Sequence, residues 1–383
     1  MINRGTKDLY RQLDEAQKMI RGAKNIDERV ALANYIGNIY RALICMGDGN
    51  VTFDRKKCFG KYGNYKKFIK KLDIYSDKMI RGFVNSKAFH KSFFGEVIPL
   101  VEDEMAKFCT LNFDGDDTFS ENDFLEVFSE FMKSLSLGDL FDEFYKSGKI
   151  YSSIVGSDKG NLGFTLHNPV NARTDLFIKD LKYDLGSMNT LAHEFGHAYD
   201  LSLLDDNVFK YNQYFYVSFY GEVMSRLFER LLFRFLLKNG VKEDVVRDKI
   251  IDFEVINFDF LLDAYILSLL DDEMFASDEY IDCDSDTIYK KVKAFFLEES
   301  DIKGVIERMQ EVDLSEVFNY AYGDIISLFL CDEYEKFGLS SDVMEYFLHE
   351  RGKLFSEDFL RECGFGPMNY AKLYTKEVQL IKK

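Results

Sequence analysis

Apolar residues recur at helical spacing along most of the chain. The pattern covers residues 1–45, 64–110 and 120–136, and from 242 to 383 it predicts several more helices joined by short polar connections. Only three prolines occur in 383 residues, which favours long uninterrupted helices. The pattern therefore predicts a mainly α-helical protein.

An acidic stretch beginning at Asp114 has the general appearance of a calcium-binding loop. Its sixth position is Phe119 instead of glycine, and its twelfth is Leu125 instead of glutamate, so calcium binding is not expected. We interpret the stretch as a loop that leads into a helix capped by Ser120.

Three short runs between residues 149 and 182 are typical of β-strands. They are Lys149–Val155, Leu162–His167 and Leu176–Leu181, and turn-forming residues separate them. The sequence therefore predicts a small antiparallel sheet within an otherwise helical chain. Its last strand, Leu176–Leu181, is expected to pair with an extended peptide by β-addition.

Two helices follow the predicted sheet. The first is expected from about Ser187 to Leu204. The second is expected from about Tyr214 to Lys238, because Asn239-Gly240 is a typical signal for a helix C-terminus.

Composition narrows the class of protein. Hydrophobic residues make up 46% of the chain, which indicates a globular protein. The net charge of −17 disfavours nucleic acid and anionic membranes as partners. No apolar run is long enough for a membrane span, and the first residues are too charged for a signal peptide. The six cysteines contain no CxxC pair, so reduced thiols and a cytoplasmic location are expected.

The most specific chemical signal is His193-Glu194-Phe195-Gly196-His197, which fits the HExxH pattern of zinc peptidases. Residues four apart on a helix share a face, so His193 and His197 can reach the same metal ion. Glu194 is placed to take a proton from a water molecule at that metal. The pattern therefore predicts a catalytic zinc site on the first of these two helices.

Catalytic zinc usually has three protein ligands and one open position. Glu222 is the candidate third ligand, because it follows His197 by 25 residues and lies on the next predicted helix. The alternative role for Glu222 is an ion pair with Arg226, one helical turn further on.

The motif and its surroundings resemble the M3 family of zinc oligopeptidases, the group of thimet oligopeptidase and oligoendopeptidase F. The resemblance rests on HEFGH, on its lead-in from Asp184 to Ala192, and on Glu222 followed by Ser225 and Glu229. The segment Phe318–Gly323 is similar to the tyrosine-rich segment of that family. The resemblance covers about residues 140–370, and the chain is shorter than a typical member.

The resemblance implies a mainly helical gluzincin fold, with a small antiparallel sheet beside the HExxH helix and a substrate cleft. Residues 1–140 would form one wall of the cleft, and residues 141–383 the catalytic domain. It further implies one Zn²⁺ per chain held by His193, His197 and Glu222, and hydrolysis of internal bonds in short peptides. Tyr320 or Tyr322, with a slight preference for Tyr320, would donate a hydrogen bond to the developing oxyanion. We expect a monomer.

The chain also departs from the family pattern just before the tyrosine-rich segment. Members usually carry a histidine just before the tyrosine-rich segment, whereas Ile306–Val317 contains none. This departure and the short N-terminal half leave two alternatives open. One is a scaffold that binds peptides or a protein with little turnover, and the other is a metallopeptidase with an open cleft and larger substrates.

Overall fold

The structure is a computed structural model of the 383-residue chain. It describes residues 6–24, 26–46, 85–102, 104–105, 113, 115–152, 163–168, 173–179, 181–203, 220–269, 286, 289–290, 293, 304, 314–340, 344, 347 and 357–382.

The described chain is mainly helical and contains one small mixed sheet, which confirms the predicted helical class. Within these residues, no helix combines the length and the apolar character that crossing a membrane requires. The chain divides into two compact units, and each is built from two stretches of sequence.

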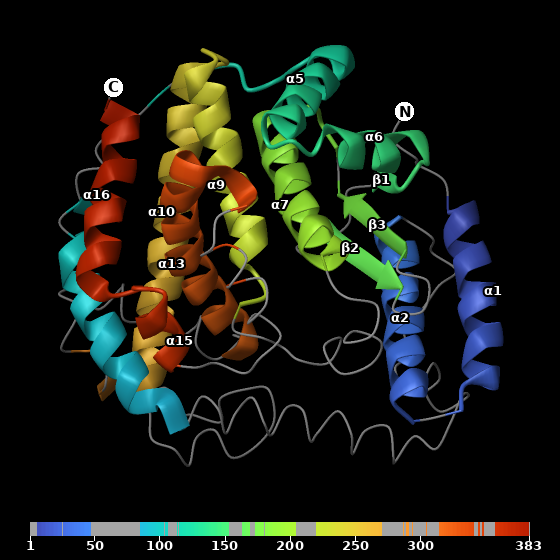
Figure 1. Ribbon diagram of the computed structural model, residues 1–383, viewed down its shortest axis with the longest axis horizontal. Coiled ribbons are helices and arrows are strands. Elements are labelled where there is room, and N and C mark those ends of the chain that lie inside the picture. The colour runs from blue at the N-terminus through green and yellow to red at the C-terminus, as the bar shows by residue number, and fades with distance from the viewer. Residues whose placement is uncertain are drawn as a thin grey trace. The chain divides into compact units, whose positions relative to one another are not determined.

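The first unit comprises Met1–Leu72 and Asp116–Tyr216. Its described helices are α1 (Lys7–Gly22), α2 (Ile26–Cys45), α5 (Glu121–Ser134), α6 (Gly138–Lys146) and α7 (Leu185–Ser202). Helix α7 packs against the sheet, α1 packs against α2, and α5 packs against α6 (Figure 1). Helix α5 begins as predicted, because the Ser120 side chain accepts a hydrogen bond from the backbone N–H of Asp123.

The sheet consists of β1 (Ile150–Ser152), β2 (Gly163–Asn168) and β3 (Arg173–Ile178), in the order β1-β3-β2. Strand β2 runs antiparallel to β3, whereas β1 runs parallel to it. The predicted antiparallel sheet is therefore wrong in one of its two pairings. The apolar pattern marks each strand, but it carries no information on which strand lies in the middle.

The central position of β3 also corrects the expectation that Leu176–Leu181 pairs with a substrate. Both edges of β3 already bond to neighbouring strands, so the backbone groups of Leu176 to Ile178 are engaged. An added strand would need the outer edge of β1 or β2.

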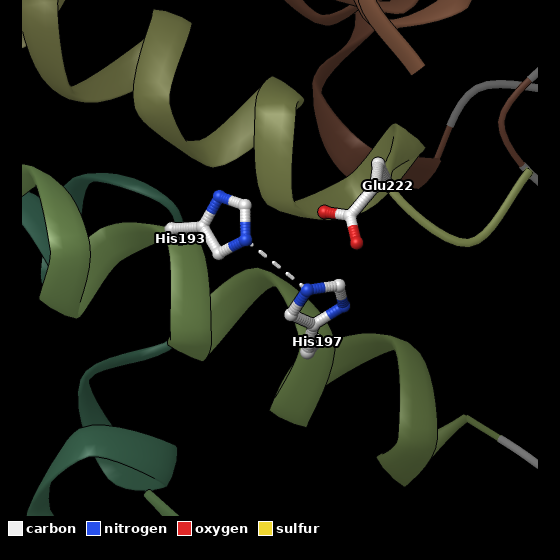
Figure 2. A group of neighbouring side chains, drawn as sticks. All are labelled: His193, His197 and Glu222. Atoms are coloured by element: carbon white, nitrogen blue, oxygen red, sulfur yellow. Dashed lines mark hydrogen bonds between the residues drawn. The ribbon is translucent and has the colours of Figure 1, made fainter. Parts of the chain in front are cut away.

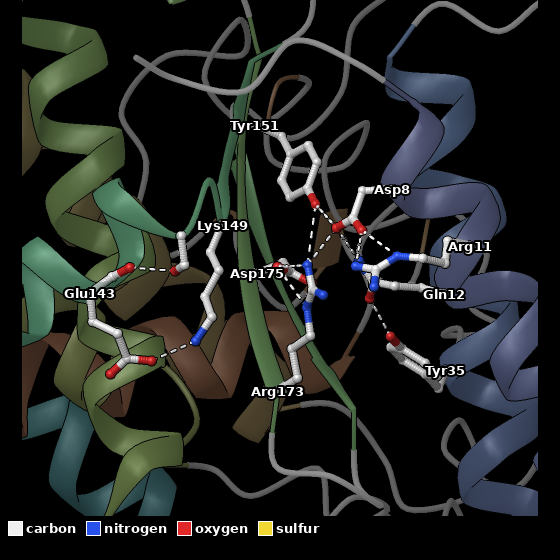
Figure 3. Close-up of polar contacts among 10 residues, drawn as sticks. Asp8, Arg11, Gln12, Tyr35, Glu143, Lys149, Tyr151, Arg173 and Asp175 are labelled. Carbon is white, nitrogen blue, oxygen red and sulfur yellow. Dashed lines mark hydrogen bonds and ion pairs between the residues drawn. The ribbon is translucent and has the colours of Figure 1, made fainter.

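A polar cluster attaches α1 to the sheet (Figure 3). The Asp8 carboxylate accepts hydrogen bonds from the Tyr151 hydroxyl and from Arg173, each at 2.5 Å. Arg173 also binds Asp175 through Nε and Nη2, at 3.0 and 2.9 Å. Burial alone would raise the pKa of Asp8, but hydrogen bonds from Tyr151 and Arg11 and the charge of Arg173 lower the pKa to about 2.

The second unit comprises Asp73–Gly115 and Val217–Lys383. Its helices include α9 (Val223–Lys238), α10 (Glu243–Leu269), α13 (Leu314–Phe337), α15 (Glu357–Glu362) and α16 (Pro367–Lys382), and a 3₁₀ turn at Gly338–Ser340 follows α13. Helix α9 packs against α10 and α13, and α16 packs against the same two helices (Figure 1). Helix α9 ends at Lys238, and Gly240 has a φ of +66°, so the predicted C-terminus is confirmed. The expected start near Tyr214 lies outside the described residues.

Three arginines at four-residue spacing on α9, Arg226, Arg230 and Arg234, form what we term the arginine row. The buried guanidinium of Arg230 binds Glu254 at 2.6 Å and also binds Asp324. These ion pairs give the buried cation anionic partners and link α9 to α10 and α13.

Candidate metal centre

Helix α7 carries the HExxH motif and begins at a capped N-terminus. The Asp184 side chain accepts a hydrogen bond from the backbone N–H of Ser187, at 2.6 Å. The helix therefore starts at Leu185, two residues before the predicted start, and ends at Ser202.

Phe195, the middle residue of the motif, fixes the rotation of α7. Its ring packs against Phe128 of α5 and against Phe141 and Phe144 of α6, with centroids 5.3–5.8 Å apart. Residues two apart on a helix point about 200° away from each other. Burial of Phe195 therefore turns His193 and His197 toward the other side of the helix.

The two histidines face each other across one helical turn (Figure 2). Their Nε2 atoms are 3.2 Å apart, and both side chains are half-buried. Tetrahedral zinc with Zn–N bonds of about 2.0–2.1 Å would separate two nitrogen ligands by roughly 3.3–3.4 Å. The observed separation therefore fits two imidazoles that bind one ion.

Glu222 directly precedes the first residue of α9, and two neighbours define its place. The Ser225 hydroxyl donates a hydrogen bond to Glu222 Oε2 at 2.7 Å. A Cβ atom added to Gly323 of α13 would lie 2.9 Å from the Glu222 Cβ. Glycine at position 323 therefore allows α13 to approach the backbone of Glu222 closely.

His193, His197 and Glu222 form a group of potential metal ligands (Figure 2). Each offers one ligand atom, and the three atoms lie within 4.8 Å of one another. Two imidazoles and one carboxylate are a donor set typical of catalytic zinc.

The side chain of Glu194 lies against strand β2. Its side chain is only 3% exposed, and the Thr165 hydroxyl lies 2.7 Å from Glu194 Oε2. A Cβ atom added to Gly163 would lie 2.9 Å from Glu194 Oε1. The candidate general base is thus enclosed by one strand of the sheet.

The two candidate tyrosines on α13 have different surroundings. Tyr322 is fully buried, and its hydroxyl is hydrogen-bonded to His90 Nδ1 at 2.6 Å. Burial lowers the pKa of His90 to about 3, so this histidine is neutral near pH 7. A hydroxyl enclosed in this way is not placed to meet a substrate carbonyl, so the structure does not favour Tyr322 for that role.

Tyr320 is half-buried and lies in a stack of planar groups. Its ring stacks on Phe260, with centroids 4.6 Å apart, and the Arg226 guanidinium lies over the ring at 5.0 Å. Arg226 also donates hydrogen bonds to Glu229 at 2.9 Å and to Asn257 at 2.6 Å. The guanidinium of Arg226 thus contacts Glu229, Asn257 and Tyr320.

Three residues that contact the site were not predicted from the sequence: Gly163, Thr165 and Gly323. Gly163 and Thr165 are two apart, so they share one face of a strand, and this alternation was visible in the sequence. The sequence did not indicate which helix this face of the strand contacts. Gly323 lies inside the tyrosine-rich segment Phe318–Gly323, but its close contact with Glu222 depends on how α13 packs against α9.

The chain was compared with known proteins. No family model matches it, and no curated protein matches it. Among solved structures it is similar to a crystal structure from Bacillus anthracis strain Ames, provisionally named an oligoendopeptidase F, with 13% sequence identity and a TM-score of 0.44. The match covers 90% of this chain and 63% of that one, so the chain spans less than two thirds of the matched protein's length.

Proposed function

We propose that the chain is a zinc-dependent oligopeptidase of the gluzincin type, related to the M3 family, that hydrolyses internal bonds of short peptides. The observation that carries the proposal is the convergence of ligand atoms from His193, His197 and Glu222, with the two imidazole nitrogens 3.2 Å apart. The hydrogen bond from Ser225 supports it, because a second partner orients a ligand carboxylate.

Each group has a role in the proposed reaction. A bound zinc ion would supply Lewis acidity toward water and toward the carbonyl of the scissile bond. Glu194 takes a proton from the attacking water and passes it to the leaving amine. Tyr320 donates a hydrogen bond to the oxygen that becomes negative as the carbonyl is attacked.

Peptide digestion combined with zinc analysis tests this proposal. We expect the wild type to bind about one zinc per chain, as catalytic sites of this class do. Glu194→Gln should keep the metal and lose cleavage by about 10²–10⁴-fold, because the amide cannot accept the proton. Glu222→Gln and His197→Ala should lose zinc as well as cleavage.

His167→Asn is the matched control for the histidine variant. His167 is a buried histidine of the first unit that is bonded to Thr174 at 2.9 Å and lies outside the ligand group. Zinc content should be unchanged in this variant. A wild-type protein that takes up no zinc would contradict the metal site.

Substrate length separates the remaining alternatives. A graded series of unstructured peptides should show a sharp upper limit if the proposed oligopeptidase is correct. Cleavage without such a limit would indicate an open cleft. A zinc-loaded protein that cleaves nothing in a broad peptide library would indicate a binding scaffold instead.

A further inference from the structure

Strand β2 encloses the carboxylate of Glu194 with two residues on one face. Gly163 and Thr165 alternate along the strand, and both lie against the Glu194 side chain. This contact joins the sheet to α7 within the first unit.

Thr165 supplies a directional contact. Its hydroxyl lies 2.7 Å from Glu194 Oε2 and 3.1 Å from the backbone oxygen of Glu194. A hydroxyl has one proton to donate, and the shorter distance favours the carboxylate. A hydrogen bond to an ionised carboxylate is about twice as strong as a neutral one.

Gly163 supplies space. A Cβ atom at this position would lie 2.9 Å from Glu194 Oε1, from the Phe177 backbone oxygen and from Thr190 Cγ2. The absence of a side chain at Gly163 therefore leaves room for the second carboxylate oxygen. Strand β2 therefore contacts both oxygens of the carboxylate, Oε2 through Thr165 and Oε1 through Gly163.

We propose that Thr165 is a positioning residue for Glu194, and that Gly163 provides the room this position requires. The inference rests on the proposed function, in which Glu194 moves the proton. Fixing Oε2 sets the direction of Oε1, and a misdirected base loses rate even when every reacting group is present. The alternative is that Thr165 only satisfies a buried carboxylate and contributes to stability.

Three variants separate these roles. Thr165→Val keeps the shape of the side chain and removes the hydroxyl, whereas Thr165→Ser keeps the hydroxyl. Thr174→Val is the control, because it removes a threonine hydroxyl that is bonded to His167 in the same sheet.

We expect Thr165→Val to lower kcat by about 10- to 100-fold while zinc content and KM stay close to wild type. Thr165→Ser should restore most of the rate. Thr174→Val should leave kcat unchanged.

A second measurement does not depend on activity. In metal-free protein, Thr165→Val should lower the melting temperature by about 2–4 °C, and this shift should disappear in a Glu194→Ala background, because the two side chains act as a pair. A coupled shift together with the fall in kcat supports the inference.

Three results would overturn the inference. A coupled shift with unchanged kcat means that Thr165 is purely structural, and it leaves the proposed function intact. Independent shifts mean that the contact does not position Glu194. A wild type that cleaves no peptide overturns the proposed function first, and the role of Thr165 in catalysis with it.

Discussion

Tyr320 and Tyr322 lie two residues apart on α13, so their side chains leave the helix in nearly opposite directions. The hydroxyl of Tyr322 is enclosed in an aromatic cluster around His90, and burial raises its pKa well above the usual value. The ring of Tyr320 contacts planar groups of α9 and α10, and the residue is partly exposed. The roles of the two tyrosines can therefore be tested by different measurements.

We predict that Tyr320→Phe lowers kcat by about 10²–10³-fold with unchanged zinc content, because loss of an oxyanion donor has this effect in other enzymes. Tyr322→Phe should instead destabilise the protein by about 1–3 kcal/mol, because His90 loses a buried hydrogen-bond partner. Steady-state kinetics and urea unfolding of both variants check this. The reverse assignment of the two effects would contradict it.

Among individual residues, the sequence predicted contacts between positions that are close together in the chain. The histidines of HEFGH are one helical turn apart, so their meeting follows from helix geometry alone. The contact of Thr165 with Glu194 joins positions 29 residues apart, and it depends on how a strand packs on a helix. No local pattern carries that information.

Helices α9 and α13 approach each other closely at Gly323. A Cβ atom there would lie 2.9 Å from the Glu222 Cβ and 3.1 Å from its carbonyl carbon. Real Cβ atoms essentially never come within 3.0 Å of another heavy atom, and the atoms nearest to this one are the Cβ and the backbone of Glu222, so a larger residue must displace Glu222 or α13. The position of Glu222 therefore depends on a residue of α13.

We predict that Gly323→Ala weakens zinc binding by about 10-fold or more, because it shifts Glu222 while leaving every ligand in place. Competition with a zinc-responsive chelator dye would measure the change. Gly22→Ala serves as control, since nothing lies within 4 Å of a Cβ at that position, and it should bind zinc like wild type. Equal zinc affinity of Gly323→Ala and Gly22→Ala would show that the position of Glu222 does not depend on the glycine at 323.

The ends of elements were more predictable than their pairing. Ser120 and Asn239-Gly240 mark helix termini through local hydrogen bonds and backbone angles, and both were found in the sequence. The order β1-β3-β2 was missed, because the last strand of the three enters between the first two. Pairing of this kind is decided by packing on α7, which the alternation of apolar residues does not encode.

The stability of the molecule depends on pH in opposite ways through two carboxyl groups. The pKa of Asp8 is lowered to about 2, so its contribution to stability is present above pH 4 and is lost as the pH falls toward 2. Burial raises the pKa of Glu254 to about 7 despite the charge of Arg230. Its contribution is therefore present below pH 4.5 and is lost as the pH rises toward 7.

We predict that stability due to these groups is greatest near pH 4–4.5 and declines on both sides. Urea midpoints measured from pH 2 to pH 8 would show this in the wild type. Asp8→Asn should flatten the acidic side only, and Glu254→Gln should flatten the side between pH 4.5 and 7 only. If the change of the urea midpoint with pH persists in the matching variant, other groups cause that change.

The arginine row has a consequence for the order in which the chain is made. Arg234 is paired with Glu377 of α16, which follows it by 143 residues. At about 5–20 residues per second, a ribosome needs roughly 7–30 s to cover that distance. The other partner of Arg234, Glu335 of α13, is made earlier, 101 residues after Arg234, so α9, although rich in leucine and phenylalanine, carries a cation that gains its two partners at different times. Because burying a cation without its partners is costly, we expect complete packing of α9 in the second unit only after α16 has been synthesised.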